Sequence, residues 1–307
     1  MSDDYDVIIL GGGAAGLSAA LYTCRAMLKT LLIEKLGCGG QVLVTENIEN
    51  YPGFPKGVLG PELSKLMEDQ ARKFGVEIIY DDVISVGDLS ISTKKVDTGK
   101  STYTAKTIII ATGGSHKQLN VPGEEEYSGK GVSYCAVCDG NFFKGADVVV
   151  IGGGDAAIDE GLYLTKIVNS VTVIHRRDTL RASKILQERA FVNSKMKFMW
   201  SHVVEEFVGG ELMEAVKVKD VKTGGVYEHS AAAAFIYVGF EPNSGFLKKY
   251  LKMDDSGHVY SNIRMETDIA GVYVCGDIRV DSDRQLGTAV GDGITAALSA
   301  YRYISEE

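Results

Sequence analysis

Residues 6–16 read DVIILGGGAAG, an apolar run followed at once by a glycine-rich turn. The run predicts a buried β-strand, and the apolar spacing of Leu17, Leu21 and Cys24 predicts a helix directly after the turn. Glycines at such a junction permit a tight turn and close approach of the backbone to a pyrophosphate, while the N-terminus of the helix faces the anion. The stretch therefore predicts the start of a dinucleotide-binding domain.

A second strand and an acidic residue complete this unit. Residues 31–33 form another apolar run that ends at Glu34, at roughly the 20-residue offset that the dinucleotide fingerprint requires. A carboxylate at this place accepts a hydrogen bond from a free ribose hydroxyl. A glycine-rich loop alone would be weak support for such a site, but here the whole order of strand, turn, helix and strand is present. The residues expected to line the site are Gly11, Gly13, Ala14, Gly16 and Glu34.

The chain carries a second copy of the same unit. Residues 148–151 form an apolar strand that leads into the turn GGGDAA at residues 152–157, and after a helical pattern residues 171–174 form the next strand. The glycines and the end of the second strand have the same spacing in both copies. The sequence therefore predicts two phosphate-binding units of one kind.

The ends of the second strands distinguish the two sites. Glu34 would repel a phosphate, whereas the second copy has His175-Arg176-Arg177 at the matching place, with Arg181 shortly after. Guanidinium groups match the oxygens of a 2′-phosphate, although a basic run is more often a solvated face. The position of this run favours the phosphate, so we expect FAD in the first site and NADPH in the second. The residues expected to bind NADPH are Gly152, Gly154, Asp155, Ala156, His175, Arg176, Arg177 and Arg181.

Length, charge and the first residues limit the other classes of function. A chain of 307 residues exceeds one ordinary hydrophobic core, which predicts two domains. Its formal net charge of −9 opposes binding to nucleic acid. The first residues lack the features of a signal peptide, and no apolar stretch approaches the roughly 20 residues of a membrane span. We therefore expect a cytoplasmic protein with no role on nucleic acid or in a membrane.

Cys135 and Cys138 form a CxxC motif shortly before the second glycine-rich turn. Such a pair can close a small disulfide ring and can lower the pKa of one thiol, so that thiolate is available near neutral pH. Without a signal peptide, a redox or metal-binding role is favoured over a structural cross-link. A structural zinc site needs four ligands, and the sequence has neither a second CxxC nor a closely spaced histidine pair, so a zinc site is disfavoured. Of the lone cysteines, Cys24 and Cys275 are expected to be buried and Cys38 to be partly exposed.

Together these motifs resemble the low-molecular-weight thioredoxin reductases, over essentially the whole chain. The segments that carry the resemblance are Gly11 to Gly16, Gly39-Gly40-Gln41, Asn50-Tyr51-Pro52-Gly53, Ala111-Thr112-Gly113, Cys135-Ala136-Val137-Cys138-Asp139, His175-Arg176-Arg177, and Gly276-Asp277 followed by Arg284-Gln285. The resemblance implies an α/β fold of two Rossmann-like, three-layer nucleotide-binding domains, with the NADPH domain inserted into a discontinuous FAD domain. Residues 1–115 and 246–307 would form the FAD-binding domain, and residues 116–245 the NADPH-binding domain with the CxxC.

The resemblance also implies roles for single residues. Cys138 would be the thiol nearest the flavin, Cys135 would exchange with the disulfide of the partner, and Asp139 would act as general acid and base. A helix beginning near Arg284 would point its N-terminal end at the isoalloxazine. The FAD-binding residues implied beyond the first fingerprint are Gly40, Gln41, Asn50, Val83, Ala111, Gly113, Gly276, Asp277, Arg284, Gln285 and Ala289.

The implied activity is that of a homodimeric thioredoxin-disulfide reductase. Electrons would pass as a hydride from NADPH to FAD, then to the Cys135–Cys138 disulfide, and by thiol exchange to thioredoxin or a thioredoxin-like protein. The domains would rotate between the half-reactions, because the flavin cannot face the nicotinamide and the dithiol at once. Ala156 and Asp159 depart from the family pattern, in which a hydroxyl residue and a glutamate are common, and these changes would weaken or retune nucleotide binding. Relatives that use ferredoxin or another donor tend to lose the basic cluster, which is complete here, so NADPH is retained as the expected donor.

Other functions match parts of the pattern. The acceptor could be a glutaredoxin-like protein or a peroxiredoxin. A flavin-bound redox sensor without turnover is disfavoured by the complete motifs for both nucleotides, and a ferredoxin or quinone reductase of similar fold is disfavoured by the CxxC. His116, His202 and His258 are isolated in the sequence and are assigned no role.

Overall fold

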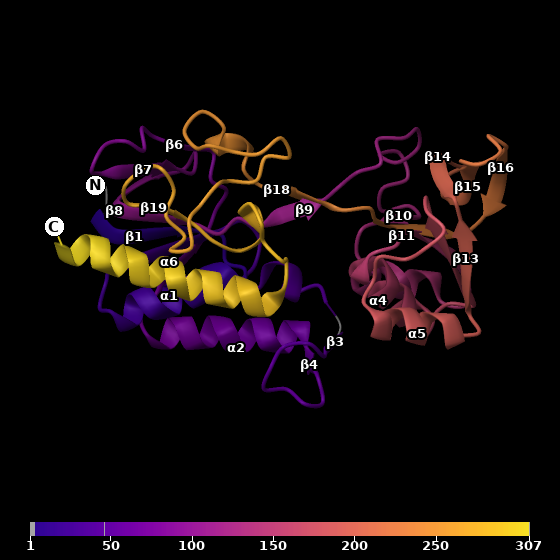
Figure 1. Ribbon diagram of the computed structural model, residues 1–307, viewed down its shortest axis with the longest axis horizontal. Coiled ribbons are helices and arrows are strands. Elements are labelled where there is room, and N and C mark those ends of the chain that lie inside the picture. Colours follow the sequence, from indigo (N-terminus) through magenta and orange to yellow (C-terminus); the bar gives the residue numbers. More distant parts are fainter. Residues whose placement is uncertain (1–3, 46, 307) are drawn as a thin grey trace. The chain divides into compact units, whose positions relative to one another are not determined.

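The computed structural model describes residues 4–45 and 47–306. The chain folds into two compact units, each with its own parallel sheet and hydrophobic core (Figure 1). One unit consists of the chain through Ser115 together with the chain from Glu241 onward, and the other consists of His116–Phe240. A unit that is continuous in sequence is therefore inserted into one that is not.

Both passages of the chain between the units lie in short strands. β9 (Gly114–His116) and β18 (Phe240–Pro242) pair in a two-stranded sheet. The second passage comes earlier than the expected boundary between residues 245 and 246. The physical reason is that Asn243 already belongs with the first unit, where its backbone N–H donates to the carbonyl of Gly113 at 2.9 Å.

The sheet of the first unit is built around β1 (Asp4–Leu10), which pairs with β2 on one side and β8 on the other. β1, β2, β5, β8 and β19 run parallel, and β7 and β6 extend the sheet in antiparallel pairing. The strands around β1 are β2 (Thr30–Glu34), β5 (Glu77–Tyr80), β6 (Ser85–Val86), β7 (Lys94–Asp97), β8 (Thr102–Ile110) and β19 (Val272–Val274).

The two faces of this sheet are buried against different parts of the chain. Val7 and Ile9 of β1 face a core that includes side chains of the helices, whereas Ile8 and Leu10 face a second core that includes side chains of β6, β7 and the segments around Leu251 and Val259. All four are fully buried, which explains why β1 reads as a continuous apolar run rather than as an alternating one. The edge formed by the carboxyl ends of these strands is where a doubly wound fold places its ligand.

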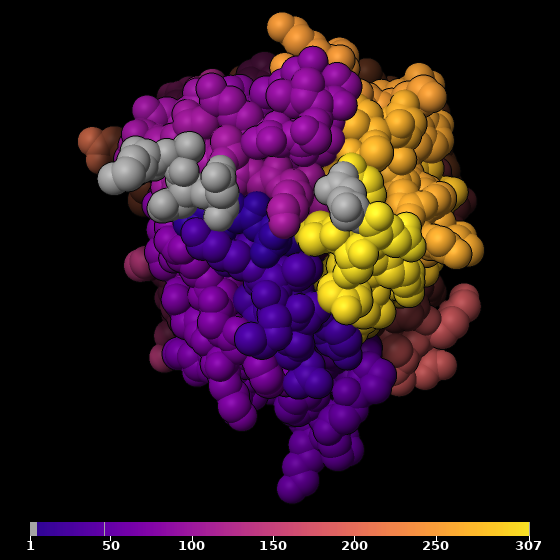
Figure 2. Space-filling view, turned by 90° about the vertical axis from the view of Figure 1, so that its left-hand side faces the viewer, coloured from indigo at the N-terminus to yellow at the C-terminus, as the bar shows by residue number. Residues whose placement is uncertain are grey.

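The helices of the first unit are α1 (Ala14–Arg25), α2 (Gly60–Lys73) and α6 (Leu286–Glu306). α6 lies against α1, with the yellow C-terminal helix beside the indigo N-terminal segment in Figures 1 and 2. Gly293 makes this approach possible, since a Cβ there would lie 2.1 Å from the carbonyl oxygen of Ala15. The shorter elements of this unit are η1 (Gly40–Val42), β3 (Asn47–Ile48), β4 (Val58–Leu59), η3 (Gly245–Leu247) and η4 (Gly276–Ile278).

The second unit repeats the same strand–turn–helix arrangement. Its parallel sheet has the order β10-β17-β11-β12-β13, and helices α4 and α5 follow β11 and β12. The strands are β10 (Val132–Ser133), β11 (Asp147–Gly152), β12 (Ser170–His175), β13 (Met196–Trp200) and β17 (Ala233–Tyr237). The helices are α3 (Ala136–Asp139), η2 (Gly140–Phe143), α4 (Asp155–Leu164) and α5 (Lys184–Val192). Nowhere in the described chain is a helix long and apolar enough to cross a membrane.

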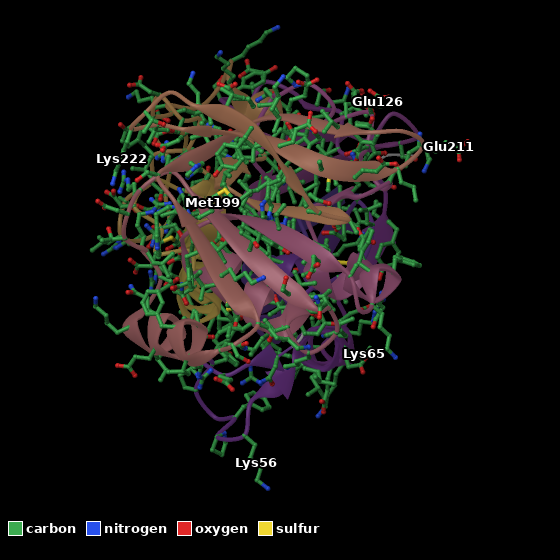
Figure 3. All side chains as sticks on the ribbon, turned by 90° about the vertical axis from the view of Figure 1, so that its right-hand side faces the viewer. Lys56, Lys65, Glu126, Met199, Glu211 and Lys222 are labelled. Atoms are coloured by element: carbon green, nitrogen blue, oxygen red, sulfur yellow. A yellow bond between two sulfur atoms is a disulfide. The ribbon has the colours of Figure 1, made fainter. Side chains whose placement is uncertain are left out.

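An antiparallel sheet completes the second unit. It consists of β14 (His202–Gly209), β15 (Met213–Asp220) and β16 (Val226–Ser230) in that order. Figure 3 shows Glu211 and Lys222 at opposite ends of this sheet, in the turns that precede and follow β15. The inward residues of these strands, among them Phe207 and Val216, are buried against Val149 and Ile151 of β11. The antiparallel sheet therefore covers one face of the parallel one.

The close crossing of α1 and α6 makes a prediction about stability. Gly293→Ala should lower the free energy of unfolding by about 2 kcal/mol, because the added methyl must push the two backbones apart. Gly291→Ala in the same helix is the matched control, since a Cβ there meets nothing within 4 Å and should add about 0.5–1 kcal/mol of helix propensity. Urea unfolding of both variants measures the difference. Equal stability of the two variants would contradict the proposed packing.

Candidate functional site

The CxxC motif forms a disulfide at the start of a short helix in the second unit. Cys135 and Cys138 are joined, with their Cα atoms 5.3 Å apart. Cys135 caps helix α3, and its Sγ accepts a hydrogen bond from the backbone N–H of Cys138 at 3.2 Å. Cys138 is exposed and Cys135 is half-buried. A backbone donor aimed at Sγ of Cys135 favours negative charge on this sulfur, which is what a nucleophilic thiol needs.

Asp139 is held beside the disulfide by Ser133. The hydroxyl of Ser133 donates to Oδ2 of Asp139 at 2.6 Å and accepts from the backbone N–H of Cys135 at 3.0 Å. The backbone N–H of Asp139 also donates to the carbonyl of Cys135 at 3.1 Å. The carboxylate fixed in this way belongs to the residue that directly follows Cys138, and its role as general acid and base stays a prediction. Sequence reasoning missed Ser133, because a serine before a CxxC carries no signal of its own.

Tyr237 also holds helix α3 in place. Its hydroxyl accepts a hydrogen bond from the backbone N–H of Ala136 at 2.9 Å, and the side chain is 9% exposed. Burial raises the pKa of Tyr237, and the nearby charge of Glu160 acts in the same direction, so the phenol stays neutral. The hydrogen bond therefore holds the first turn of the CxxC helix onto the end of β17.

A buried carboxylate anchors the residue that precedes Cys135. Glu124 is 4% exposed and accepts hydrogen bonds from the backbone N–H groups of Leu119 and Asn120 and from the hydroxyl of Tyr134, the last at 2.7 Å. Burial and this carboxylate raise the pKa of Tyr134. The ring of His116 stacks on Tyr134 with centroids 6.2 Å apart. Glu124 thus joins the segment after β9 to the CxxC loop.

The first glycine-rich turn has the geometry of a phosphate-binding loop. A Cβ at Gly16 would lie 1.9 Å from the carbonyl oxygen of Gly11, so only glycine lets α1 start this close to the end of β1. Glu34 closes β2 and accepts from the backbone N–H groups of Gly12 at 2.7 Å and Leu36 at 3.1 Å. Its carboxylate is therefore fixed at the ribose-reading position of the fingerprint. Ala14 begins the helix, with Gly13 as its N-cap.

Several residues predicted to contact FAD meet here although they are distant in sequence. Gly11 lies against Ala111, Gly13 lies against Gly40, and Gly276 lies near Ala289. The amide of Asn50 donates to the amide oxygen of Gln285 at 3.1 Å. Of the remaining predicted residues, Gln41 is exposed in η1, Val83 packs half-buried against the sheet core, and Gly113 is half-buried after β8.

Asp277 carries the clearest sign of a ligand in this unit. Its Oδ1 is buried and, within the described residues, has no hydrogen-bond partner. Burial raises the pKa of Asp277, and the positive charge of Arg284 opposes that rise. A buried acceptor without a donor is costly unless a bound group supplies one. The hydroxyls of the FAD ribitol chain are donors of this kind, so the residues present fit the cofactor.

The second glycine-rich turn has similar geometry. A Cβ at Gly152 would lie 2.4 Å from the carbonyl oxygen of Tyr237. Gly154 is the N-cap of α4, whose first residues are Asp155 and Ala156. The carboxylate of Asp155 accepts a hydrogen bond from the backbone N–H of Ser183, which ties the start of α4 to the N-cap of α5.

The basic residues after β12 are not equivalent. Arg176, Arg177 and Arg181 are exposed, and the backbone N–H of Arg181 donates to Gly153 at 2.7 Å, which ties it to the turn. His175 is 5% exposed, its ring lies directly beneath Gly153, and burial lowers its pKa. His175 therefore supports the turn as a neutral ring, and its predicted part in binding NADPH stays a prediction. The sequence pattern does not indicate that His175, the last residue of β12, is buried.

The other cysteines have no redox partner in the described structure. Cys24, Cys38 and Cys275 are free and buried, so the expectation that Cys38 is partly exposed is wrong. Burial, with the charge of Glu68, raises the pKa of Cys38 to about 11. Across residues 4–45 and 47–306 no group of three or more His, Cys, Asp or Glu side chains is arranged to hold a metal ion.

Comparisons with known proteins agree with this geometry. Residues 5–297 match the family described as pyridine nucleotide-disulphide oxidoreductase. The thioredoxin reductase of Bacillus subtilis (strain 168) is 48% identical over 304 residues, which covers 98% of this chain and 95% of the relative. The thioredoxin reductase of Peptoclostridium litorale is 44% identical and covers 100% and 99%. The crystal structure of Lactococcus lactis thioredoxin reductase in its FR conformation superposes with a TM-score of 0.96 at 46% identity, and covers 99% of this chain and 100% of that one.

The anchoring role of Glu124 can be tested with a neighbouring control. Glu124→Gln should lower the free energy of unfolding by about 2 kcal/mol, because the amide NH₂ group would face a donor where an acceptor is needed. Glu125→Gln should change it by less than about 0.5 kcal/mol, since Glu125 is exposed. Denaturant unfolding followed by circular dichroism gives both values. Equal effects of the two substitutions would show that Glu124 does not anchor the loop.

Proposed function

The chain belongs to the pyridine nucleotide-disulphide oxidoreductases, and within them to the low-molecular-weight thioredoxin reductases, and we propose that it transfers electrons from NADPH through FAD to thioredoxin. The observation that carries the proposal is the Cys135–Cys138 disulfide, which closes beside Asp139 in the unit that also has the second phosphate-binding turn. A pyridine nucleotide, a flavin and a dithiol are the three carriers that such a transfer needs.

FAD is assigned to the first unit. Its pyrophosphate would face the N-terminus of α1 at Gly13 and Ala14, a ribose hydroxyl would donate to Glu34, and the ribitol chain would donate to the orphan Oδ1 of Asp277. When bound, FAD supplies a two-electron carrier between the nicotinamide and the disulfide. The paired amides of Asn50 and Gln285 can orient the ring system, because each has further donor and acceptor capacity.

NADPH is assigned to the second unit. The N-terminus of α4, with Gly154 as its N-cap, can bind the pyrophosphate, and the exposed guanidinium groups of Arg176, Arg177 and Arg181 can surround a 2′-phosphate. His175 adds no positive charge, since its pKa is lowered and its ring is buried. The preference for the phosphorylated nucleotide is therefore assigned to the three arginines.

The dithiol reacts by two successive exchanges. The Cys135 thiolate attacks one sulfur of the partner disulfide, which forms a mixed disulfide and releases a thiolate of the partner. Cys138 then attacks the sulfur of Cys135, which restores the Cys135–Cys138 disulfide and releases the second thiol of the partner. Two electrons pass to the partner, and Asp139 takes up and returns the protons that the thiols exchange. The backbone N–H of Cys138 favours Cys135 as the attacking sulfur.

The acceptor is assigned from the relatives. The proteins that match along the full length of the chain are named thioredoxin reductases, which supports thioredoxin over a glutaredoxin-like protein or a peroxiredoxin. A homodimer and a cytoplasmic location stay predictions of the family resemblance.

Substitution of the cysteines tests the dithiol mechanism. Cys138→Ser should lower the rate of thioredoxin reduction by at least about a thousandfold, because Cys135 alone cannot resolve the mixed disulfide. Anaerobic bleaching of the flavin by NADPH should persist in this variant, since that step does not use the thiols. Cys24→Ala is the control and should keep turnover, because Cys24 is a buried packing residue. Reduction of thioredoxin by Cys138→Ser at the wild-type rate would rule out the mechanism.

A further inference from the structure

His258, to which the sequence assigns no role, lies beside the flavin-site residues of the first unit. The residue is 8% exposed. The next residue, Val259, donates its N–H to the carbonyl of Ile278 at 3.0 Å and accepts from the N–H of Val280 at 2.9 Å. These hydrogen bonds fix His258 next to the segment that carries Asp277.

A chain of hydrogen bonds runs through the imidazole of His258. Nη2 of Arg284 lies 3.2 Å from Nε2, and Oδ2 of Asp254 lies 3.3 Å from Nδ1. The backbone N–H of His258 donates to the other carboxylate oxygen of Asp254 at 2.8 Å. The three side chains come from a loop and from the segment before α6, and they meet in one unit.

The chemistry of arginine fixes the state of the imidazole. A guanidinium group has donors only and does not lose its proton in proteins, so Nε2 of His258 must carry a lone pair to accept from Arg284. Nδ1 then carries the proton and donates to Asp254. These two contacts fit the tautomer with the proton on Nδ1, for which Asp254 is the acceptor.

Arg284 needs such support. Its backbone has a φ of 55°, a conformation that non-glycine residues seldom adopt, and its side chain is exposed. An exposed arginine samples many rotamers, and fixing one of them costs up to about 2 kcal/mol of conformational entropy. The positive charge of Arg284 opposes the rise that burial causes in the pKa of Asp277, whose buried Oδ1 has no hydrogen-bond donor within the described residues. If the arginine is already held in one rotamer, this entropy is not lost when the ligand binds.

We propose that His258 is a positioning residue which, together with Asp254, holds the guanidinium of Arg284 in the orientation that receives FAD. The inference rests on the proposed function, because it takes the first unit as the FAD site. A leucine could fill the same space but could not accept from Arg284. A glutamine could accept through Oε1, so the two substitutions separate the hydrogen bond from packing.

The tautomer provides a test that needs no cofactor. In nitrogen-15 NMR of the histidine side chains at pH 8, the resonances lost in His258→Gln identify His258. The proposal expects a protonated Nδ1 and an unprotonated Nε2, and Asp254→Asn should weaken this preference. A proton on Nε2 in the wild-type protein would overturn the proposal.

Binding of FAD to the apoprotein provides the second test, followed by quenching of flavin fluorescence. His258→Leu should weaken FAD binding about fivefold, the equivalent of about 1 kcal/mol, whereas His258→Gln should stay within about twofold of the wild type. His229→Leu, a half-buried histidine in the other unit, is the control and should have no effect. In an Arg284→Ala background, His258→Leu should change FAD binding no further.

The possible outcomes distinguish failure of the proposed function from failure of the positioning role of His258. Wild-type protein that binds no FAD would overturn the proposed function. Normal FAD binding by His258→Leu, or an equal loss with and without Arg284, would overturn the positioning role of His258 and leave the proposed function intact.

Discussion

The contact between backbone and backbone at the two glycine-rich turns is the constraint on which the rest of the structure depends. At Gly16 the space for a Cβ is taken by the carbonyl oxygen of Gly11, and at Gly152 it is taken by that of Tyr237. The contact at Gly16 brings the N-terminus of α1 to the carboxyl ends of buried parallel strands, where backbone N–H groups can bind an anion. The contact at Gly152 holds β11 against β17 at the corresponding edge of the second sheet. Tyr237 links this constraint to the chemistry, because its carbonyl oxygen faces Gly152 while its hydroxyl holds the CxxC helix through Ala136.

The hydrogen bonds that hold the CxxC loop in the described part of the chain come from neutral and anionic groups. Ser133, Tyr237 and Glu124 fix the backbone around it, and the N–H of Cys138 provides the local positive potential at Sγ of Cys135. Such buried supports fix the geometry of a short loop whose Cys135 must react with another protein. In the first unit, the exposed Arg284 is likewise held by a buried residue, His258.

Elements whose geometry is set by short-range spacing can be predicted from the sequence. The apolar run of β1, the turn at Gly11 and the end of β2 at Glu34 lie within a few dozen residues, and the period of the pattern fixes their geometry. Features decided by tertiary placement could not be predicted. Glu124 is one of three consecutive glutamates, and no local signal shows that it alone is buried. His175 opens a basic run in the sequence, and no local signal shows that its ring is buried against Gly153. The pairing of His258 with Arg284 likewise requires the segment before α6 to return beside a distant loop.

The central claim is that electrons enter from NADPH and leave through the dithiol to thioredoxin. Anaerobic titration of the flavin-loaded protein with NADPH, and separately with NADH, tests it most directly when flavin bleaching is followed by addition of oxidised thioredoxin. The account predicts rapid bleaching by NADPH, a much weaker response to NADH, and recovery of the flavin colour as thioredoxin is reduced. Absence of bleaching with both nucleotides would contradict the assignment of the donor, and bleaching that thioredoxin cannot reverse would contradict the assignment of the acceptor.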